Sequence, residues 1–190
     1  DLTPLREGLS DPAATDEEGN IPLHIAAASG SYRSVLLLLS VGTDISSVND
    51  AGETPLHLAA SGGSPDIAEL LIDEGAAVSA EDQNGDTPLH KAVRSGSVEV
   101  AELLSAADAP LMASNDDGER PLSLALGDQE MLEALLRPER LNERNAAGDT
   151  LLISAARIPS PALVEALVAR NVDTEAEGPD GERAIDIALE

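Results

Sequence analysis

The pattern of apolar and polar positions repeats along the chain with a period of 33 residues. Copies of the segment GETPLHLAA start at six glycines: Gly19, Gly52, Gly85, Gly118, Gly148 and Gly181. Consecutive copies are 33 residues apart except for one step of 30. This spacing indicates a repeat architecture, in which each unit buries its apolar face against its neighbours.

Each unit predicts two short helices after a polar turn. The glycine lies in the turn, where a positive φ angle is easily adopted only without a Cβ atom. In the second copy, Thr54 and Pro55 provide an N-cap and a first-turn proline, which predict a helix over LHLAAS, residues 56–61. Gly63 ends this helix, and a second helix with apolar residues at helical spacing follows from Pro65.

A 33-residue unit that carries TPLHLAA resembles the ankyrin repeat, and the resemblance covers nearly the whole chain. It implies a β-turn or hairpin finger followed by two antiparallel helices, which stack into a solenoid. The expected fold is therefore all-α: an ankyrin-repeat solenoid of stacked helix-turn-helix units with β-turn or hairpin fingers.

The repeats predict a single ankyrin-repeat domain over residues 1–190. Its expected parts are a partial repeat at 1–15, full repeats at 16–48, 49–81, 82–114, 115–144 and 145–177, and a partial last repeat at 178–190. The fourth repeat is three residues short and has Gln129 where the 33-residue period places the glycine between the helices. The fifth has Leu151 and Ile153 where proline and histidine would stand. We therefore expect an irregular joint at the fourth and fifth repeats.

Composition restricts the core and its chemistry. The chain is 42% apolar but has one aromatic residue, Tyr32, so that Ala, Leu, Ile and Val must fill the core. It has no cysteine, which excludes disulfides, thiolate metal sites and a cysteine nucleophile.

Charge restricts the partners. With 11 basic and 36 acidic residues, the net charge is −25, which argues against nucleic acid and anionic membranes as partners. The longest apolar run, VLLLL at 35–39, is too short to span a bilayer, and no basic segment followed by an apolar one opens the chain. A cytoplasmic location is therefore expected.

The three histidines could belong to a catalytic or metal site, but their spacing argues against it. His24, His57 and His90 occupy the same place in successive units, so that they lie about 8–10 Å apart, too far to share one zinc ion. The ankyrin resemblance instead implies buried or half-buried histidines that bond to the backbone near the fingers. No nucleophile elbow, phosphate-binding loop or calcium loop is present. We expect no enzyme activity, no cofactor and no metal.

Acidic residues concentrate in the turns. The five residues that end just after each motif glycine contain 13 acids in 30 residues and no Lys or Arg, where a uniform spread would give about six. Turns favour Asp, but Glu is not a turn former. Because the resemblance places these turns in a row beside the concave face, we interpret the chain as a scaffold that binds a protein, expected to be basic.

The candidate partner-binding residues follow from this resemblance and are acids and polar residues of the fingers together with exposed ends of first helices. They are Glu17, Glu18, Asp50, Glu53, Ser61, Gln83, Asp86, Arg94, Ser95, Asp116, Asp117, Glu119, Asp128, Asp149 and Arg157.

Two other interpretations stay open. Ten arginines against one lysine, together with the many acids, also resemble proteins from salt-rich cytoplasm, whose acidity serves solubility. The array could also be a structural spacer or an autoinhibitory arm of a larger protein. A monomer is expected over a homo-oligomer, with an end-to-end dimer through Ile187 and Leu189 as the alternative. Lys91, at a mostly apolar place in the repeat, is expected to lay its stem on the core and lift its ammonium to water or an acid.

Overall fold

The structure, a computed structural model, describes residues 12–138, 140–145 and 147–189. The expected partial repeat at 1–15 lies largely outside these residues. The regular elements are the helices α2 (Pro22–Ala28), α3 (Tyr32–Ser40), α4 (Pro55–Ser61), α5 (Pro65–Asp73), α6 (Pro88–Ser95), α7 (Val98–Ala106), α8 (Pro121–Leu124), α9 (Gln129–Leu135), α10 (Leu151–Ala156), α11 (Pro161–Val168) and α12 (Ala184–Ala188).

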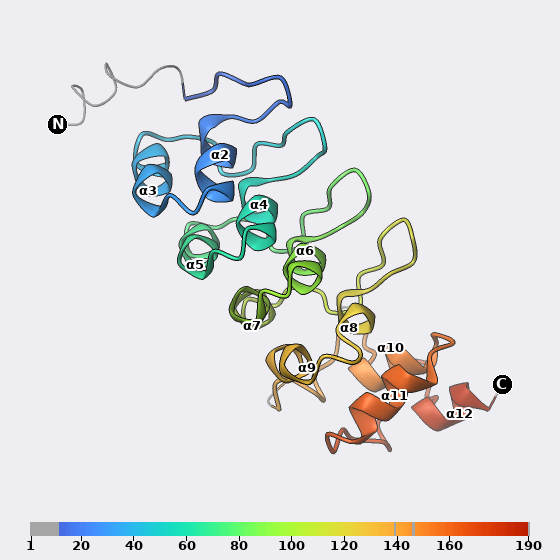
Figure 1. Cartoon of the computed structure of the whole chain (residues 1–190). Coiled ribbons are helices and arrows are strands. Elements are labelled where there is room, and N and C mark those ends of the chain that lie inside the picture. Colours follow the sequence, from blue (N-terminus) through green and yellow to red (C-terminus); the bar gives the residue numbers. More distant parts are fainter. Residues whose placement is uncertain (1–11, 139, 146, 190) are drawn as a thin grey trace. The chain divides into compact units, whose positions relative to one another are not determined.

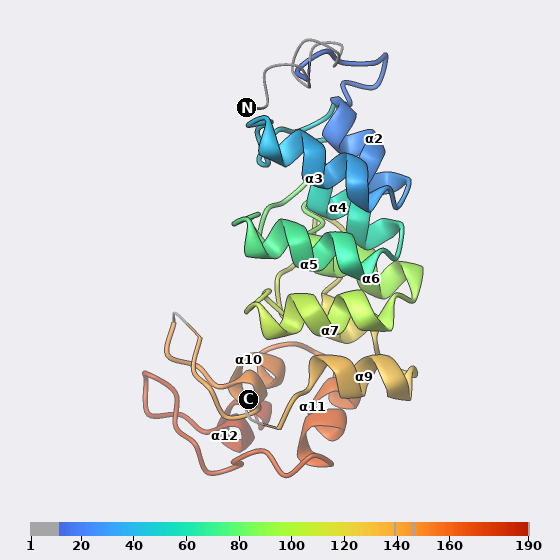
Figure 2. The ribbon, with the colours of Figure 1, turned by 90° about the vertical axis from the view of Figure 1, so that its left-hand side faces the viewer.

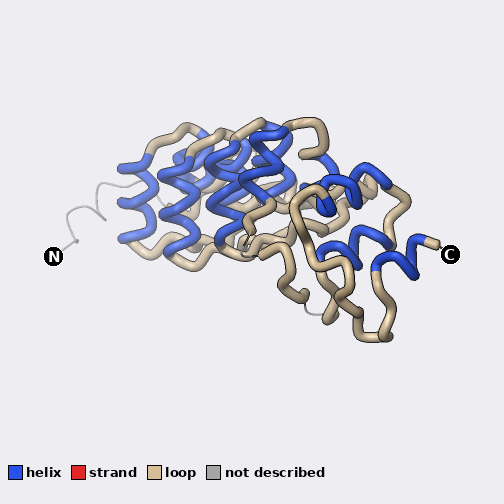
Figure 3. The backbone as a smooth tube through the Cα atoms, turned by 90° about the horizontal axis from the view of Figure 1, so that it is seen from below, coloured by secondary structure: helices blue, strands red, loops and turns tan. Residues whose placement is uncertain are grey.

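The predicted all-α fold is confirmed. Within the described ranges no strand is present, and β pairing is limited to two isolated bridges, Arg144 with Thr150 and Glu177 with Arg183 (Figure 3). The helices begin where the capping signals predict. Thr54 precedes Pro55 in an extended conformation, and Thr87 precedes Pro88 in the same way.

The chain divides into two compact units, one up to Leu124 and one from Ala125. In the first unit α2, α4, α6 and α8 contact one another in order and form one layer of helices. The second helices of the repeats, α3, α5 and α7, form another layer beside it (Figures 1 and 2). This arrangement is the helix-pair stack that the 33-residue period predicts.

Ladders of equivalent residues build the core of the first unit. Leu23, Leu56, Leu89 and Leu122 recur every 33 residues, and each is at most 1% exposed. A second ladder of Leu38, Leu71 and Leu104 lies in the layer of second helices and is also buried. Buried alanines separate the leucines, so that the helices pack closely without aromatic side chains.

The polar turn before each first helix, which we call a finger, projects from the layer of first helices (Figure 1). In the first unit the backbones of successive fingers are hydrogen-bonded: the amide of Asp50 donates to the carbonyl of Glu18 (3.0 Å), and the amide of Gln83 donates to that of Ala51 (2.9 Å). Gly52 has a φ of +77°, and a Cβ atom there would lie 2.9 Å from the nitrogen of Gln83. The close approach of neighbouring fingers therefore requires glycine at this position.

The second unit contains α9, α10, α11 and α12, with α10 in contact with both α11 and α12. Its largest fully buried side chains are Met131, Leu135, Ile153, Leu163 and Leu167. The division between the units falls in the fourth repeat, just after α8, which has only four residues. The boundaries of the individual repeats remain a prediction.

Candidate functional site

Each of the three histidines joins a first helix to the following finger. His57 is fully buried, and its Nδ1 accepts a hydrogen bond from the backbone amide of Thr54 (3.1 Å). Its Nε2 lies 2.9 Å from the backbone carbonyl of Asp86 in the next finger. Because an amide can only donate and a carbonyl can only accept, the ring is the neutral tautomer with its proton on Nε2.

His24 and His90 repeat this arrangement, with Nε2 bonded to the carbonyls of Glu53 (2.9 Å) and Glu119 (3.2 Å). Burial lowers the pKa of all three imidazoles, which keeps them neutral. Both ring nitrogens of each histidine are used within the fold. The backbone-bonding role that the sequence predicts is therefore what the structure shows. In the described part of the chain, no three His, Asp or Glu side chains are grouped as metal ligands.

Each finger of the first unit starts with Asn or Asp. The side-chain oxygen of this residue accepts two backbone amides of its own turn; Asn115 Oδ1, for example, accepts from Asp117 (3.1 Å) and Glu119 (2.8 Å). Where the residue is asparagine, its amide nitrogen also donates to the previous finger: Asn49 to Asn20 (3.0 Å), and Asn115 to Asp86 (2.8 Å).

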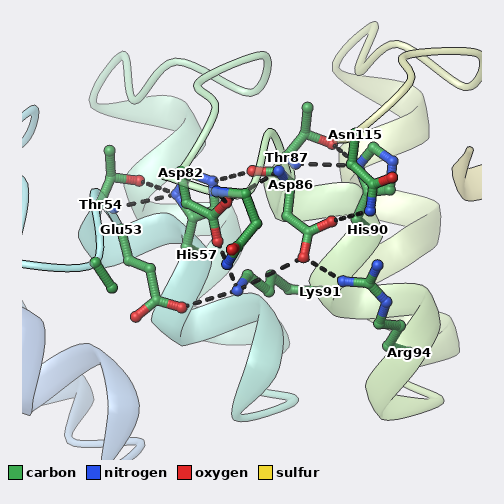
Figure 4. A network of polar contacts seen from close by, with 12 residues as sticks. Glu53, Thr54, His57, Asp82, Asp86, Thr87, His90, Lys91, Arg94 and Asn115 are labelled. Carbon is green, nitrogen blue, oxygen red and sulfur yellow. Dashed lines mark hydrogen bonds and ion pairs between the residues drawn. The ribbon is translucent and has the colours of Figure 1, made fainter. Parts of the chain in front are cut away.

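Among the fingers that follow another finger, only that of Asp82 starts with an acid in place of asparagine. This acid explains the presence of the single lysine. Its second oxygen stands where asparagine would offer an amide donor, and the facing residue of the previous finger is the carboxylate Glu53. Lys91 on α6 supplies the missing donor: its Nζ lies 2.7 Å from Asp82 Oδ2 and 3.0 Å from Glu53 Oε1 (Figure 4). The Asp82 side chain is only 1% exposed. Lys91 thus separates two carboxylates that would otherwise face each other.

The protonation equilibria agree with this arrangement. Burial opposes the charged form of Asp82, but hydrogen bonds from Lys91 and from the turn amides lower its pKa. Burial likewise opposes the ammonium of Lys91, but its hydrogen bonds to Asp82 and Glu53 raise its pKa. The pair is therefore held in its ionised form.

Arg94 extends the network by one finger. It lies one turn further along α6 than Lys91 and forms ion pairs with Asp86 and Glu119 (Figure 4). Asp86 also accepts a hydrogen bond from Asn115. Two cations of α6 therefore bind carboxylates from three successive fingers.

The predicted finger acids separate into two rows. The base row comprises the last residue of each finger: Asn20, Glu53, Asp86 and Glu119. The tip row comprises residues three positions earlier: Glu17, Asp50, Gln83 and Asp116. In the base row, Glu53, Asp86 and Glu119 are all occupied by Lys91 or Arg94.

The tip row is exposed. Across the described residues no hydrogen bond or ion pair engages the carboxylates of Glu17, Asp50 or Asp116. Gln83 donates its amide to the carbonyl of Asp50 (2.7 Å). Beside this row, Glu18 and Asp117 are also exposed. The structure thus brings the tip row together at the surface and uses the base row internally.

The remaining candidates lie elsewhere. Ser61 and Ser95 are exposed at the ends of α4 and α6, and the hydroxyl of Ser95 donates to the carbonyl of Ala60 (3.1 Å). In the second unit, Asp128 caps α9 by accepting from the amide of Met131. The buried Asp149 pairs with Arg157 at 3.2 Å.

Sequence reasoning missed the exposed apolar residues of the first unit, two of which lie near the fingers. Ile25 is 51% exposed on α2, at the position that corresponds to Lys91 on α6. Because Lys91 reaches the fingers from this position, Ile25 lies on the side of α2 that faces the fingers. Val48, just before the second finger, is 58% exposed. The repeat equivalence of positions 25, 58 and 91 could have indicated that Ile25 is exposed, because Lys91 occupies the same place.

In the described chain, every helix is too short or too polar to cross a membrane. The family model described as "Ankyrin repeats (3 copies)" matches residues 23–115 and 81–145, which together make up more than half of the chain. No curated protein sequence matches the chain.

Proposed function

The chain belongs to the ankyrin repeat family, whose repeats are generally protein–protein interaction modules, and we propose that it is a non-enzymatic scaffold for a basic protein partner. The partner presents Lys or Arg side chains to the finger side of the first unit. This is the side at which the resemblance implies the concave face.

The observation that carries the proposal is the tip row. Backbone hydrogen bonds hold successive fingers together, so that Glu17, Asp50 and Asp116 are presented at fixed intervals. Their carboxylates have no partner among the described residues, whereas the base-row carboxylates behind them are neutralised. A row of unpaired acids attracts a basic segment and speeds its association at low salt.

Exposed apolar residues complete this surface. Ile25 faces the fingers from α2, and Val48 precedes the second finger. The chain has few of the aromatic residues that dominate tight interfaces. The affinity therefore rests on charge pairs and a few aliphatic contacts, and it is moderate and sensitive to salt.

Salt adaptation and the needs of the fold are the second explanation of the acidity, and the ion-pair network supports a role of the base row in the fold. The acids of the base row stabilise the fold through Lys91 and Arg94 and leave nothing for a partner. The array would then be a spacer or an autoinhibitory module of a larger protein, with no use for the tip row.

Capture experiments distinguish partner binding through the tip row from salt adaptation. The immobilised chain is exposed to a lysate of its native host, and the captured proteins are compared for two variants of equal charge. One carries Glu17→Gln, Asp50→Asn and Asp116→Asn. The matched control carries Glu74→Gln, Glu99→Gln and Glu102→Gln, three exposed acids outside the fingers.

The proposal expects a basic protein that the control variant retains and the tip-row variant loses by about tenfold, since exposed charge pairs contribute about 0.2–1 kcal/mol each. Equal capture by both variants would contradict the role of the tip row.

A further inference from the structure

The outer face of α3 exposes two large apolar side chains. Tyr32 is 43% exposed and Leu36 is 48% exposed, and they lie one turn apart on the same face of the helix. The residues equivalent to Leu36, 33 and 66 positions later, are Glu69 on α5 and Glu102 on α7. The equivalents of Tyr32 are Pro65 and Val98, which are apolar but half-buried. Among α3, α5 and α7, large exposed apolar side chains are therefore found on α3.

A pocket of about 250 Å³ lies next to this face. It is lined by Tyr32 from α3 and by Asp66, Glu69, Leu70 and Asp73 from α5. The four α5 residues have the spacing i, i+3, i+4 and i+7 of a single helix face. Pockets for drug-sized ligands measure roughly 300–1,000 Å³, so this one suits a single side chain.

The acids of this pocket differ from those of the base row. In the portion of the chain that is described, no hydrogen bond or ion pair engages the carboxylates of Asp66, Glu69 or Asp73, and all three are exposed. They surround an aromatic ring and the half-buried Leu70. An aromatic ring beside unpaired carboxylates attracts a cation whose stem is apolar, as in Arg and Lys.

We propose that the face formed by α3 and α5 binds a positively charged, amphipathic helix of a partner protein. An Arg or Lys side chain of that helix enters the pocket between Tyr32 and the α5 carboxylates, and an apolar residue packs on Leu36. This surface belongs to the second helices and is separate from the tip row. A second copy of the chain is the poorer occupant, because each copy carries a net charge of −25.

Tyr32 allows a local measurement, because it is the only aromatic residue of the chain. The probe is a synthetic peptide of about 18 residues with Leu and Arg at helical spacing, long enough to form a helix when bound. It is titrated into the full chain while tyrosine fluorescence is recorded. We expect a saturable change in fluorescence. A peptide with the same arginines but Ser in place of Leu is expected to bind at least about fivefold more weakly, because Ser cannot bury the apolar surface that Leu buries.

Variants then locate the site. Asp66→Asn, Glu69→Gln and Asp73→Asn together are expected to weaken the fluorescence-detected binding by about tenfold, and Leu36→Ser by about fivefold. The variant with Glu74→Gln, Glu99→Gln and Glu102→Gln, and the tip-row variant, each remove the same charge and are expected to change it less than about twofold. Circular dichroism checks that each variant is folded.

Three results would overturn the proposal. One is peptide binding that leaves the fluorescence of Tyr32 unchanged. Another is equal weakening by all the charge-neutralised variants, which would show attraction to the overall charge only. The third is self-association of the chain in light scattering that Leu36→Ser abolishes, which would make a second copy the occupant. Because the tip-row variant is scored separately, failure here leaves the proposed finger-side function untouched, and the reverse also holds.

Discussion

A neutral imidazole is a requirement of this fold. Each histidine accepts an amide at Nδ1, so that a proton added there would face an N–H group. Burial holds the pKa of each imidazole below its ordinary value. As the pH falls below about 6.5 the unfolded chain takes up protons that the folded chain does not, and the free energy of unfolding must decrease.

The pH dependence of stability can be assigned to one histidine. Between pH 7.5 and 5.5 each histidine with a lowered pKa removes at most about 1.4 kcal/mol of stability. His57→Gln keeps an acceptor for the amide of Thr54 but does not titrate. Urea unfolding at both pH values should show a less stable variant whose loss of stability on acidification is smaller than that of the natural chain. An identical loss would mean that His57 is protonated in the folded state.

A double-mutant cycle tests the role of Lys91. Lys91→Leu, which introduces the residue found at position 58, leaves the buried carboxylate of Asp82 facing Glu53 and should cost about 1–3 kcal/mol. In an Asp82→Asn background the amide donates to Glu53, as Asn115 does to Asp86, and the same change should cost less than about 1 kcal/mol. Equal costs in the two backgrounds, measured by urea unfolding, would contradict the compensation.

The sequence predicted Lys91 only in part. Its apolar equivalents, Ile25 and Leu58, indicated a stem on the core and an ammonium directed to water or an acid. The reason for the substitution could not be found within one repeat, because the partner acids Asp82 and Glu53 come from two fingers. Likewise, the turns identified the finger acids but not which of them are paired.

At the scale of elements, the contact between fingers depends on glycine. Gly52→Ala adds a methyl group 2.9 Å from the nitrogen of Gln83, in a backbone conformation that is already unfavourable for alanine. Gly75→Ala has the same conformational cost, with a φ of +92°, but its Cβ meets nothing within 4 Å. Both variants should be destabilised by about 1 kcal/mol, and Gly52→Ala by at least about 1 kcal/mol more. Equal losses in thermal unfolding would show that the fingers separate at little cost.

The helices were the most predictable elements, because their signals are local. Thr-Pro and Ser-Pro pairs mark their first residues, and glycines at Gly63 and Gly96 take the left-handed conformation that ends them. The pocket on α3 and α5 could not be predicted in this way. It depends on Tyr32 meeting side chains of the next repeat, and no pattern within one helix indicates that contact.

At the scale of the whole molecule, the net charge of −25 predicts that salt stabilises the chain. Thermal unfolding at about 0.02 M and 0.5 M NaCl should show a higher midpoint at high salt, where the screening length is only a few ångströms. The tip-row variant should be more stable than the natural chain at low salt and equal to it at high salt. If stability instead fell with added salt, the ion pairs of Lys91 and Arg94 would outweigh the repulsion among the exposed acids.

The ion pairs of Lys91 with Asp82 and Glu53 also restrict the order of the repeats. Asp82 and Lys91 belong to one repeat, and the glutamate that they require belongs to the repeat before it. If residues 82–114 directly followed residues 16–48, Asp82 would meet Asn20 in place of Glu53, and Lys91 would lose one of the three acids around it, keeping Asp82 and Asp86. The repeats share one backbone arrangement, but their order cannot be changed freely. The ion pairs of one repeat depend on charged residues of the repeat before it.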